Sequence, residues 1–351
     1  MHKKIRLAIA GVGNCASSLI QGVEFYRATR DTIGLLYPEI GGYKPQDIEI
    51  VAAFDVAENK VNRDISEAIW AYPNNTEKLF DVPHKGVKVM MGPVLDGVPP
   101  HLEKYVKVAN REPVDVAKVL KEAEVDVLVN LIPTGSSKAA RYYARAAIEA
   151  GAAFINGMPE LIVSGDEEIN RMALEYGVPL VGDDFKSQIG ATIVNRTLIK
   201  LFLDRGVKVQ SCYQLNYAGN TDFVNLVFRG ETKHVTKSSA LKSLLPYEAE
   251  ISTAFAYVEC QRDRKIARIE LKGLKWGGAV TRLSVELDVN DSADAAGVMV
   301  DMIRCAQLAK DRGIAGKLIA VSAYYAKHPP VQYPDSEAKQ MLEEFIYGQG
   351  T

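Results

Sequence analysis

The stretch Gly11-Val12-Gly13-Asn14-Cys15-Ala16-Ser17-Ser18, directly after the apolar run Ile5 to Ala10, decides the expected fold. It forms a Gly-x-Gly-x-x-Ala pattern between a predicted strand and a predicted helix. Gly11 would make the tight turn, Gly13 would let the backbone approach a pyrophosphate, and Ala16 would keep the helix close to the sheet. The N-terminus of that helix would face the anion. A glycine pattern alone is weak evidence, but its order after a strand favours a dinucleotide-binding turn over an ordinary loop.

The composition is that of a soluble globular protein. The chain has 351 residues, more than a single core usually supports, so we expect two domains. A net charge of -2, with both signs interspersed, argues against a nucleic acid or a membrane as partner. Four scattered cysteines predict neither a disulfide framework nor a thiolate zinc site. No signal peptide or membrane-spanning run is apparent, and we expect a cytoplasmic protein.

The first half of the chain alternates apolar strands with amphipathic helices. This alternation predicts a Rossmann-type, doubly wound parallel sheet covered on both faces. The segment 26–46, rich in glycine and proline, is expected to be an inserted surface loop. The predicted strands are 48–54, 125–131, 153–156 and 179–181, and the predicted helices are 114–122, 136–150, 167–176 and 189–203.

Ligands of such sheets bind beyond the carboxyl ends of the strands. Asp55 ends the second strand, where an acid binds the adenosine ribose and disfavours the phosphate of NADP. Asp55 lies further from Gly11 than the usual spacing of about 20 residues, which the inserted loop explains. A simple turn aspartate is the alternative. The segments 130–134, 156–159 and 183–187 follow other strands and are expected at the same edge.

From residue 207 the pattern changes to a period of two. Segments 207–217, 266–271 and 283–289 alternate apolar and polar residues, which predicts a second, largely antiparallel sheet with one wet face. An apolar outer face on this α+β domain would suit subunit association. Helical periodicity returns over 295–312. We therefore predict a dinucleotide-binding domain over 1–204, a catalytic and oligomerisation domain over 205–291, and a C-terminal segment, 292–351, that returns to the first domain.

Four lysines are candidates for chemistry: Lys233, Lys237, Lys265 and Lys327. Lys233 and Lys237 would share a helix face if their segment is one helix. Thr236 is equally suited to cap a helix that starts at Lys237, which would leave Lys233 in a loop. For any of these lysines taken alone, a solvated side chain is the better interpretation.

Three acids stand beside expected strand ends: Asp183, Asp184 and Asp222. Such carboxylates could hold a sugar hydroxyl, orient a lysine or bind a divalent cation. Capping of a helix or turn by Asp184 or Asp222 fits the local sequence equally well. His234 has no other histidine near it in sequence, so no histidine metal site is assigned.

Taken together, these blocks resemble the myo-inositol-1-phosphate synthase family, in its shorter archaeal and bacterial branch, over nearly the whole chain. Ser292-Ala293-Asp294 departs from the family's usual Ser-Pro-Asn, and Thr232 and Thr236 stand where relatives often have Ser. Neither departure removes a reacting group. The blocks that carry the resemblance are Gly11 to Ser18, Ala53-Phe54-Asp55, Asn74-Asn75-Thr76, Gly182 to Ser187, Gly219 to Phe223, Thr236-Lys237, Arg264-Lys265, Ala309 to Gly313 and Ser322-Ala323-Tyr324.

The resemblance implies an NAD-dependent isomerase that converts D-glucose 6-phosphate to 1D-myo-inositol 3-phosphate, the first step towards inositol and its phospholipids. The steps would be oxidation at carbon 5, enolisation, aldol closure and re-reduction, with no net redox. Each step develops negative charge on oxygen, which explains the need for several cations. Lysine suits such a site because its pKa can fall toward neutrality among other cations.

Roles follow by position in the family motifs. Lys265 would transfer a proton at the aldehyde oxygen, Lys327 would stabilise the carbon 5 oxygen, and Lys233 and Lys237 would transfer protons and hold the phosphate. Asp184 and Asp222 would orient substrate and lysines or bind a cation. The implied substrate-binding residues are Asn220, Asp222, Lys233, Lys237, Lys265 and Lys327. The implied NAD-binding residues are Gly11, Gly13, Asn14, Cys15, Ala16, Asp55, Asn75, Pro133, Thr134, Asp183, Lys186 and Ser187.

Two other functions fit parts of the pattern. An NAD-dependent sugar or polyol dehydrogenase would use the same two-domain plan, and a non-catalytic NAD-binding regulator would need no convergent lysines. The resemblance also implies a homotetramer. It leaves open whether a divalent metal or a monovalent cation such as ammonium or potassium assists.

Overall fold

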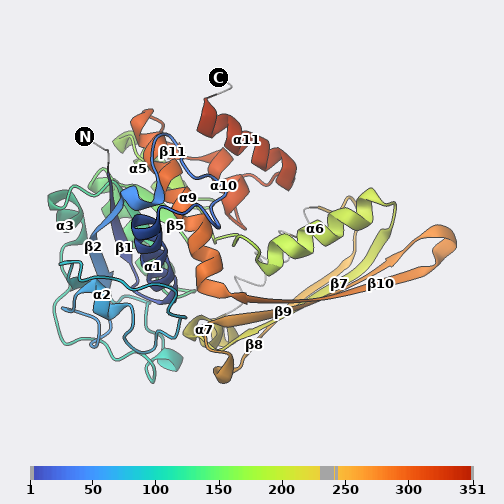
Figure 1. Cartoon of the computed structure of the whole chain (residues 1–351), viewed down its shortest axis with the longest axis horizontal. Helices are drawn as coiled ribbons and strands as arrows, with labels where there is room; N and C mark the ends of the chain where they lie inside the picture. The colour runs from blue at the N-terminus through green and yellow to red at the C-terminus, as the bar shows by residue number, and fades with distance from the viewer. Residues whose placement is uncertain (1–3, 230–240, 242–243, 349–351) are drawn as a thin grey trace.

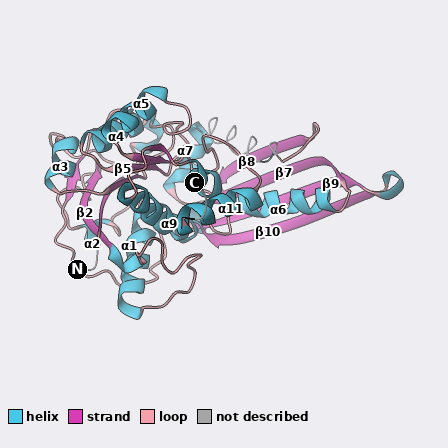
Figure 2. Cartoon of the chain, turned by 90° about the horizontal axis from the view of Figure 1, so that it is seen from above, coloured by secondary structure: helices cyan, strands magenta, loops and turns pink. Residues whose placement is uncertain are grey.

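The structure, a computed structural model, describes residues 4–229, 241 and 244–348. It consists of a body built on one sheet and an arm built on a second (Figure 1). Seen from above, the arm extends away from the body (Figure 2). The predicted Rossmann-type parallel sheet with a second sheet domain is confirmed.

The body contains a seven-stranded sheet in the order β11-β6-β5-β4-β1-β2-β3, and every neighbouring pair is parallel. Strand order reverses between β1 and β4, and ligands of such sheets bind in the crevice at this switch point. The strands are β1 (Ile5–Ala10), β2 (Ile48–Asp55), β3 (Val89–Met91), β4 (Val127–Asn130), β5 (Ala153–Asn156), β6 (Pro179–Val181) and β11 (Gly316–Lys317).

Helices cover both faces of this sheet because its strands are apolar on both sides. One face packs against α1 (Asn14–Thr29) and α9 (Asp291–Asp311), and the other packs against α3 (Val116–Glu122), α4 (Ser137–Glu149) and α5 (Glu167–Tyr176). The long α9 shows how the C-terminal part of the chain completes the first core: Met299, Met302 and Ile303 are fully buried against residues of β1 and α1.

The inserted loop starts later than predicted. α1 continues to Thr29, and the chain leaves it at Arg30, which has φ +59°. The side chain of Arg304, fully buried in α9, pairs with Asp301 and donates to the carbonyl oxygens of Tyr37 (2.8 Å), Pro38 (3.2 Å) and Tyr43 (3.3 Å). One buried guanidinium therefore fixes the loop on the core.

The arm is a four-stranded sheet in the order β10-β9-β7-β8. Its strands are β7 (Lys208–Ala218), β8 (Glu250–Tyr257), β9 (Arg264–Leu274) and β10 (Val280–Asn290). β9 is antiparallel to both β7 and β10, but β8, which sequence reasoning missed, is parallel to β7. The sheet is thus mixed, and the largely antiparallel expectation holds for two of its three pairings.

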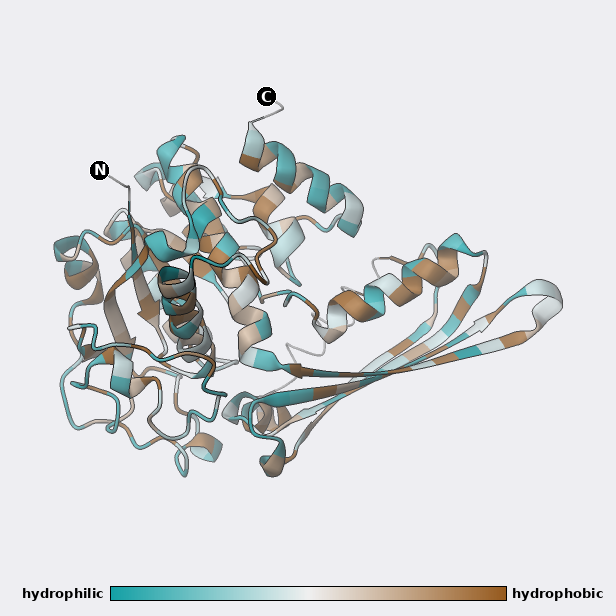
Figure 3. Cartoon of the chain, in the orientation of Figure 1, coloured by the Kyte–Doolittle hydropathy of each residue, from teal (hydrophilic) through white to brown (hydrophobic). Residues whose placement is uncertain are grey.

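Among the described residues, α6 (Ala191–Asp204) covers one face of the arm and leaves the other open. α6 packs Ile199 and Phe202 against Val209, Ile269 and Leu271 of the sheet. Figure 3 shows polar and apolar residues alternating along these strands. α6 therefore contacts the second sheet, although it precedes residue 205, and the predicted division into three domains stays a prediction.

The remaining elements close the body. α2 (Ile65–Ala68) follows β2, α7 (Thr221–Arg229) follows β7, and α10 (Ile319–Tyr325) and α11 (Asp335–Tyr347) follow β11. β11 pairs with β6, so the C-terminal segment extends the first sheet. Among the described residues, no helix is both long and apolar enough to cross a membrane.

Candidate active site

A cleft follows the carboxyl edge of the parallel sheet and reaches the base of the arm. The glycine turn and the ends of β2, β4 and β5 form one side, and the first residues of α6, α7, β9 and α9 form the other. Its lining includes these residues named from the sequence: Gly11, Gly13, Asn14, Cys15, Asp55, Pro133, Asp184, Ser187, Asn220, Asp222, Lys265 and Lys327.

The geometry of the glycine turn suits a bound dinucleotide. Gly11 has φ +92°, and a Cβ there would lie 2.6 Å from the Leu131 carbonyl oxygen, so only glycine fits. A Cβ on Gly13 would meet no atom within 4 Å, which leaves the space beside this backbone open to the cleft. Ala16 is fully buried beneath the turn. α1 begins at Asn14 without an acidic residue in its first turn, which keeps its N-terminus available to an anion.

Asp55 is held rigidly at the end of β2. One oxygen accepts from the Val12 amide (2.9 Å), and the other accepts from the amides of Val56 (2.7 Å) and Ala57 (2.9 Å). The ammonium of Lys60 lies 3.8 Å from the Asp55 carboxylate. Lys60 also donates to the Val12 carbonyl and to the Asn74 side chain, both at 2.9 Å.

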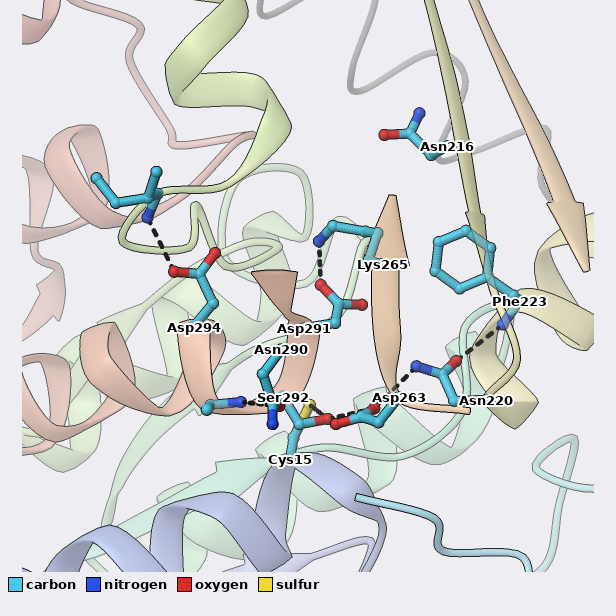
Figure 4. A network of polar contacts seen from close by, with 12 residues as sticks. Cys15, Asn216, Asn220, Phe223, Asp263, Lys265, Asn290, Asp291, Ser292 and Asp294 are labelled. Atoms are coloured by element: carbon cyan, nitrogen blue, oxygen red, sulfur yellow. Dashed lines mark hydrogen bonds and ion pairs between the residues drawn. The ribbon is translucent and has the colours of Figure 1, made fainter. Parts of the chain in front are cut away.

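Asp263 joins the glycine-turn side of the cleft to the arm (Figure 4). Its Oδ1 accepts from the side-chain amides of Asn14 (2.9 Å) and Asn220 (3.0 Å) and from the hydroxyl of Ser292 (2.9 Å). Its Oδ2 is buried without a hydrogen-bond partner among the described residues. Burial and then the charge of Asp291 raise the pKa of Asp263 to about 6.

The hydrogen-bond network around Asp263 also includes Asn75 and Cys15. Asn14 also donates to Asn75 (2.8 Å), and the Asn75 side chain donates to the Gly219 carbonyl at the end of β7 (3.0 Å). The thiol of Cys15 lies 3.9 Å from the Ser292 hydroxyl, and burial followed by the charge of Asp263 raises its pKa to about 12. Cys15 is therefore a neutral thiol at physiological pH and no nucleophile.

Besides Lys60, two lysines named from the sequence line the cleft, and each is paired with a carboxylate. Lys265, at the start of β9, pairs with Asp291, which follows the antiparallel partner strand β10 (Figure 4). Lys327 contacts Asp184 at 2.6 Å because the segment after α10 pairs with the segment after β6 through the bridge Phe185 to Ala326. The second Asp184 oxygen is buried without a hydrogen-bond partner in the described part of the chain.

Asp184 and Asp222 are cleft residues rather than helix caps. Asp184 has φ +64°, a conformation that non-glycine residues adopt at a cost and that clusters at functional sites. Asn220, not Asp222, caps α7, because its side chain accepts from the Phe223 amide at 3.2 Å. The Asp222 carboxylate accepts from the Thr134 hydroxyl at 2.9 Å.

Comparison with known proteins agrees with this geometry. The model of the myo-inositol-1-phosphate synthase family matches residues 190–292. Inositol-3-phosphate synthase of Mycolicibacterium smegmatis is 47% identical over 98% of this chain and 98% of its own. The chain belongs to the myo-inositol-1-phosphate synthase family. The inositol-3-phosphate synthase of Mycobacterium tuberculosis CDC 1551 is 46% identical over 98% of this chain and 96% of its own.

A solved structure shows the same fold. The crystal structure of a myo-inositol-1-phosphate synthase-related protein from Thermotoga maritima superposes with a TM-score of 0.81. It is 25% identical, and the match covers 98% of both chains. The resemblance seen in the sequence motifs is thereby confirmed.

Some predicted residues of this family member lie behind the cleft. Asp183 is fully buried and accepts from Asn156 (2.7 Å) and from the Ser164 amide (2.9 Å); burial raises its pKa to about 6 despite these bonds. Lys186 donates to the Ala323 carbonyl (3.1 Å) and pairs with Asp335 (3.2 Å). Burial lowers the pKa of Lys186 to about 8. Direct contact of Asp183 and Lys186 with NAD stays a prediction.

The other predicted residues divide into two groups. Asn75 and Thr134 are bonded to cleft residues from just outside it. Lys233, Lys237 and His234 lie outside the described residues, so their roles stay predictions. No group of three or more metal-ligating side chains occurs within residues 4–229, 241 and 244–348.

Sequence reasoning did not single out four residues that the geometry emphasises: Lys60, Asp263, Asp291 and Ser292. Asp263 stands two residues before Lys265 at the start of a strand. This spacing could have indicated that both side chains lie on the same side of the strand as the site. Asp291 is 26 residues from Lys265, and only the pairing of β9 with β10 shows that they meet.

Proposed function

We propose that this chain converts D-glucose 6-phosphate to 1D-myo-inositol 3-phosphate with NAD, as an isomerase without net redox. Family membership supports this proposal. The observation that carries it is that two lysines, Lys265 and Lys327, share one cleft with a dinucleotide-binding turn. A dehydrogenase needs the turn, whereas a reaction that also enolises and closes a ring needs several cations beside the sugar.

The residues of the cleft would divide the work. Bound NAD would supply the oxidation at carbon 5 of the sugar and the final reduction. The glycine turn and Asp55 would hold the two ends of its adenosine diphosphate. Lys327 would stabilise negative charge on the carbon 5 oxygen, and its pairing with Asp184 keeps its ammonium in place. Lys265, fixed by Asp291, would exchange a proton at the aldehyde oxygen.

The sugar phosphate would bind where α6 begins. Gly190, Ala191 and Thr192 line the cleft at the N-terminus of α6, and this end of a 14-residue helix attracts anions. Lys233 and Lys237 remain our candidates for the remaining phosphate and proton-transfer contacts. We therefore propose that the phosphate binds on the arm side of the cleft and the dinucleotide on the body side.

Product identification tests the proposal. The enzyme would be incubated with ¹³C-labelled glucose 6-phosphate and a catalytic amount of NAD, with EDTA, Mg²⁺ or ammonium in parallel, and followed by NMR. We expect inositol phosphate after many turnovers per NAD, without net absorbance at 340 nm. NADH that accumulates with turnover would indicate the dehydrogenase. Unreacted sugar phosphate under all conditions would refute the proposal.

We also propose a homotetramer, formed through the open face of the arm. This face carries the exposed Tyr213, and the β9–β10 turn carries Trp276, whose side chain is 93% exposed. An open sheet face with such aromatic residues is suited to association. Sedimentation velocity should give a tetramer for the wild type, and a monomer at micromolar concentration would contradict it.

Three finer points belong to the same proposal: NAD rather than NADP as the cofactor, a cytoplasmic location, and a place at the start of inositol phospholipid synthesis. The cysteines of the described residues, Cys15, Cys212, Cys260 and Cys305, are all free, which is compatible with a reducing compartment.

A further inference from the structure

We propose that Lys60 controls cofactor selectivity together with Asp55: the Lys60 ammonium is a latent 2′-phosphate site that the Asp55 carboxylate neutralises. This inference rests on the proposed use of NAD. In dinucleotide folds the acid at the end of the second strand binds the ribose 2′-hydroxyl, and a cation nearby accommodates a 2′-phosphate instead. Here both kinds of residue occupy the same corner of the cleft.

The first step of the argument is the position of Asp55. β1 and β2 are neighbours in register, with Ala10 opposite Phe54, and the Gly11 amide donates to the Phe54 carbonyl at 2.8 Å. The end of β2 therefore lies directly beside the glycine turn. One Asp55 oxygen already accepts two backbone amides, while the other accepts one, that of Val12. This second oxygen keeps capacity for a ribose hydroxyl.

The second step is the environment of Lys60. Its side chain is 6% exposed, yet it lines the cleft. Its two close contacts, the Val12 carbonyl and the Asn74 amide oxygen, are neutral. Within the described residues its ion pair is with Asp55, at 3.8 Å. The charge of Lys60 is thus balanced by the same carboxylate that should bind the ribose.

The third step is that Lys60 does not depend on Asp55 for its place. Asn74 is itself anchored, because its side-chain amide donates to the carbonyls of Val12 and Ile69, both at 3.0 Å. Loss of the Asp55 charge would leave Lys60 fixed beside the turn by Val12 and Asn74. A buried ammonium without a counter-charge then favours an anionic ligand.

The test is the selectivity ratio, defined as Kd for NADP divided by Kd for NAD. Both would be measured by calorimetry for the wild type, Asp55→Asn, Lys60→Met and the double variant. A hydrogen bond to a charged group is worth about 10- to 100-fold in affinity. We expect Asp55→Asn to lower the ratio by about tenfold or more. In the double variant, Lys60→Met should raise the ratio most of the way back to its wild-type value. Lys60→Met alone should raise the ratio above the wild-type value.

Two further variants separate selectivity from structure. Lys60→Arg keeps the charge and should behave as Lys60 does in the Asp55→Asn background. Lys310→Met removes a lysine that pairs with Asp126 at 3.4 Å, just before β4 and therefore at the opposite edge of the sheet, and should leave the ratio unchanged. A purely structural role of Lys60 would weaken NAD and NADP equally, so Lys60→Met would leave the ratio unchanged both in the wild type and in the Asp55→Asn background.

The outcomes distinguish the two proposals. NAD binding by the wild type, with a ratio that does not respond to Lys60 in the Asp55→Asn background, overturns the inference alone. Absence of NAD binding by the wild type overturns the proposed function and this inference with it. NADP affinity of Asp55→Asn that falls with added salt more steeply than NAD affinity supports it.

Discussion

Replacement of Asp263 by asparagine should change how the stability of the protein depends on pH. Burial, followed by the charge of Asp291, raises the pKa of this carboxyl group from 3.8 to about 6 in the folded chain. The folded state therefore holds the proton more tightly than the unfolded state. Asp263 favours folding when protonated, and this contribution is lost as pH rises from 3.8 through 6. At neutral pH the ionised Asp263 opposes folding.

The size of the effect follows from the shift. A rise of about two pKa units corresponds to about 3 kcal/mol in the free energy of unfolding. Roughly half of it, between about 1 and 2 kcal/mol, is lost between about pH 5 and pH 7.5. The asparagine side chain of the variant would not ionise, and its single oxygen could still accept from Asn14, Asn220 and Ser292. The wild type should thus lose more stability than Asp263→Asn across this interval.

Urea denaturation followed by far-UV circular dichroism at pH 5, 6 and 7.5 measures this difference at constant ionic strength. Asp81→Asn is the control, because the Asp81 side chain is 87% exposed. Parallel pH profiles for the wild type and Asp263→Asn would show that Asp263 does not titrate near pH 6, and would refute the reasoning.

Three other predictions concern the site and its support. Lys265→Ala should retain the wild-type Kd for NAD and lose turnover by at least about 100-fold; near-wild-type turnover would remove Lys265 from the catalytic set. Asp335→Ala should lower the free energy of unfolding by about 2 kcal/mol, since Lys186 and Arg196 lose their shared carboxylate, and Asp335 is itself 37% exposed. An unchanged melting temperature would contradict this. Arg304→Met should cost about 3 to 5 kcal/mol and make the inserted loop sensitive to limited proteolysis; a loop as resistant to protease as that of the wild type would show that Arg304 does not anchor it.

Much of the fold was predictable because it depends on local periodicity. The apolar strands β1, β2 and β4 and the helices that alternate with them follow patterns that few other structures produce. β3 and β11, with three and two residues, are too short to give a period, as is β6, which was predicted from its place in the alternation of strands and helices. β8 was missed because its register is fixed by β7, far along the chain, and its own residues are mostly small or polar.

The candidate site was predictable only through the combination of motifs. A lysine taken alone is indistinguishable from a solvated one, and the pairing of Lys327 with Asp184 joins residues 143 positions apart. The β-bridge between the segments after β6 and α10 creates this contact, and no local pattern encodes it. The role of Lys60 could not be predicted for the same reason, because its partners Val12 and Asn74 belong to other loops.

The hydrogen bonds of Asp263 link the glycine turn to the base of the arm and to α9, and therefore to the two sides of the proposed site. Asn14 belongs to the turn, Asn220 caps α7 at the base of the arm, and Ser292 lies in the first turn of α9; all three donate to one oxygen. The proposed reaction removes a hydride and returns it to the same sugar, so cofactor and substrate must keep their relative position throughout. The ionised Asp263 carboxylate lowers the free energy of unfolding by about 3 kcal/mol at neutral pH, and this loss of stability is tolerable if Asp263 fixes that position. Stability and alignment therefore oppose each other at this residue, and a variant more stable at about pH 7.5 than the wild type should be the slower enzyme.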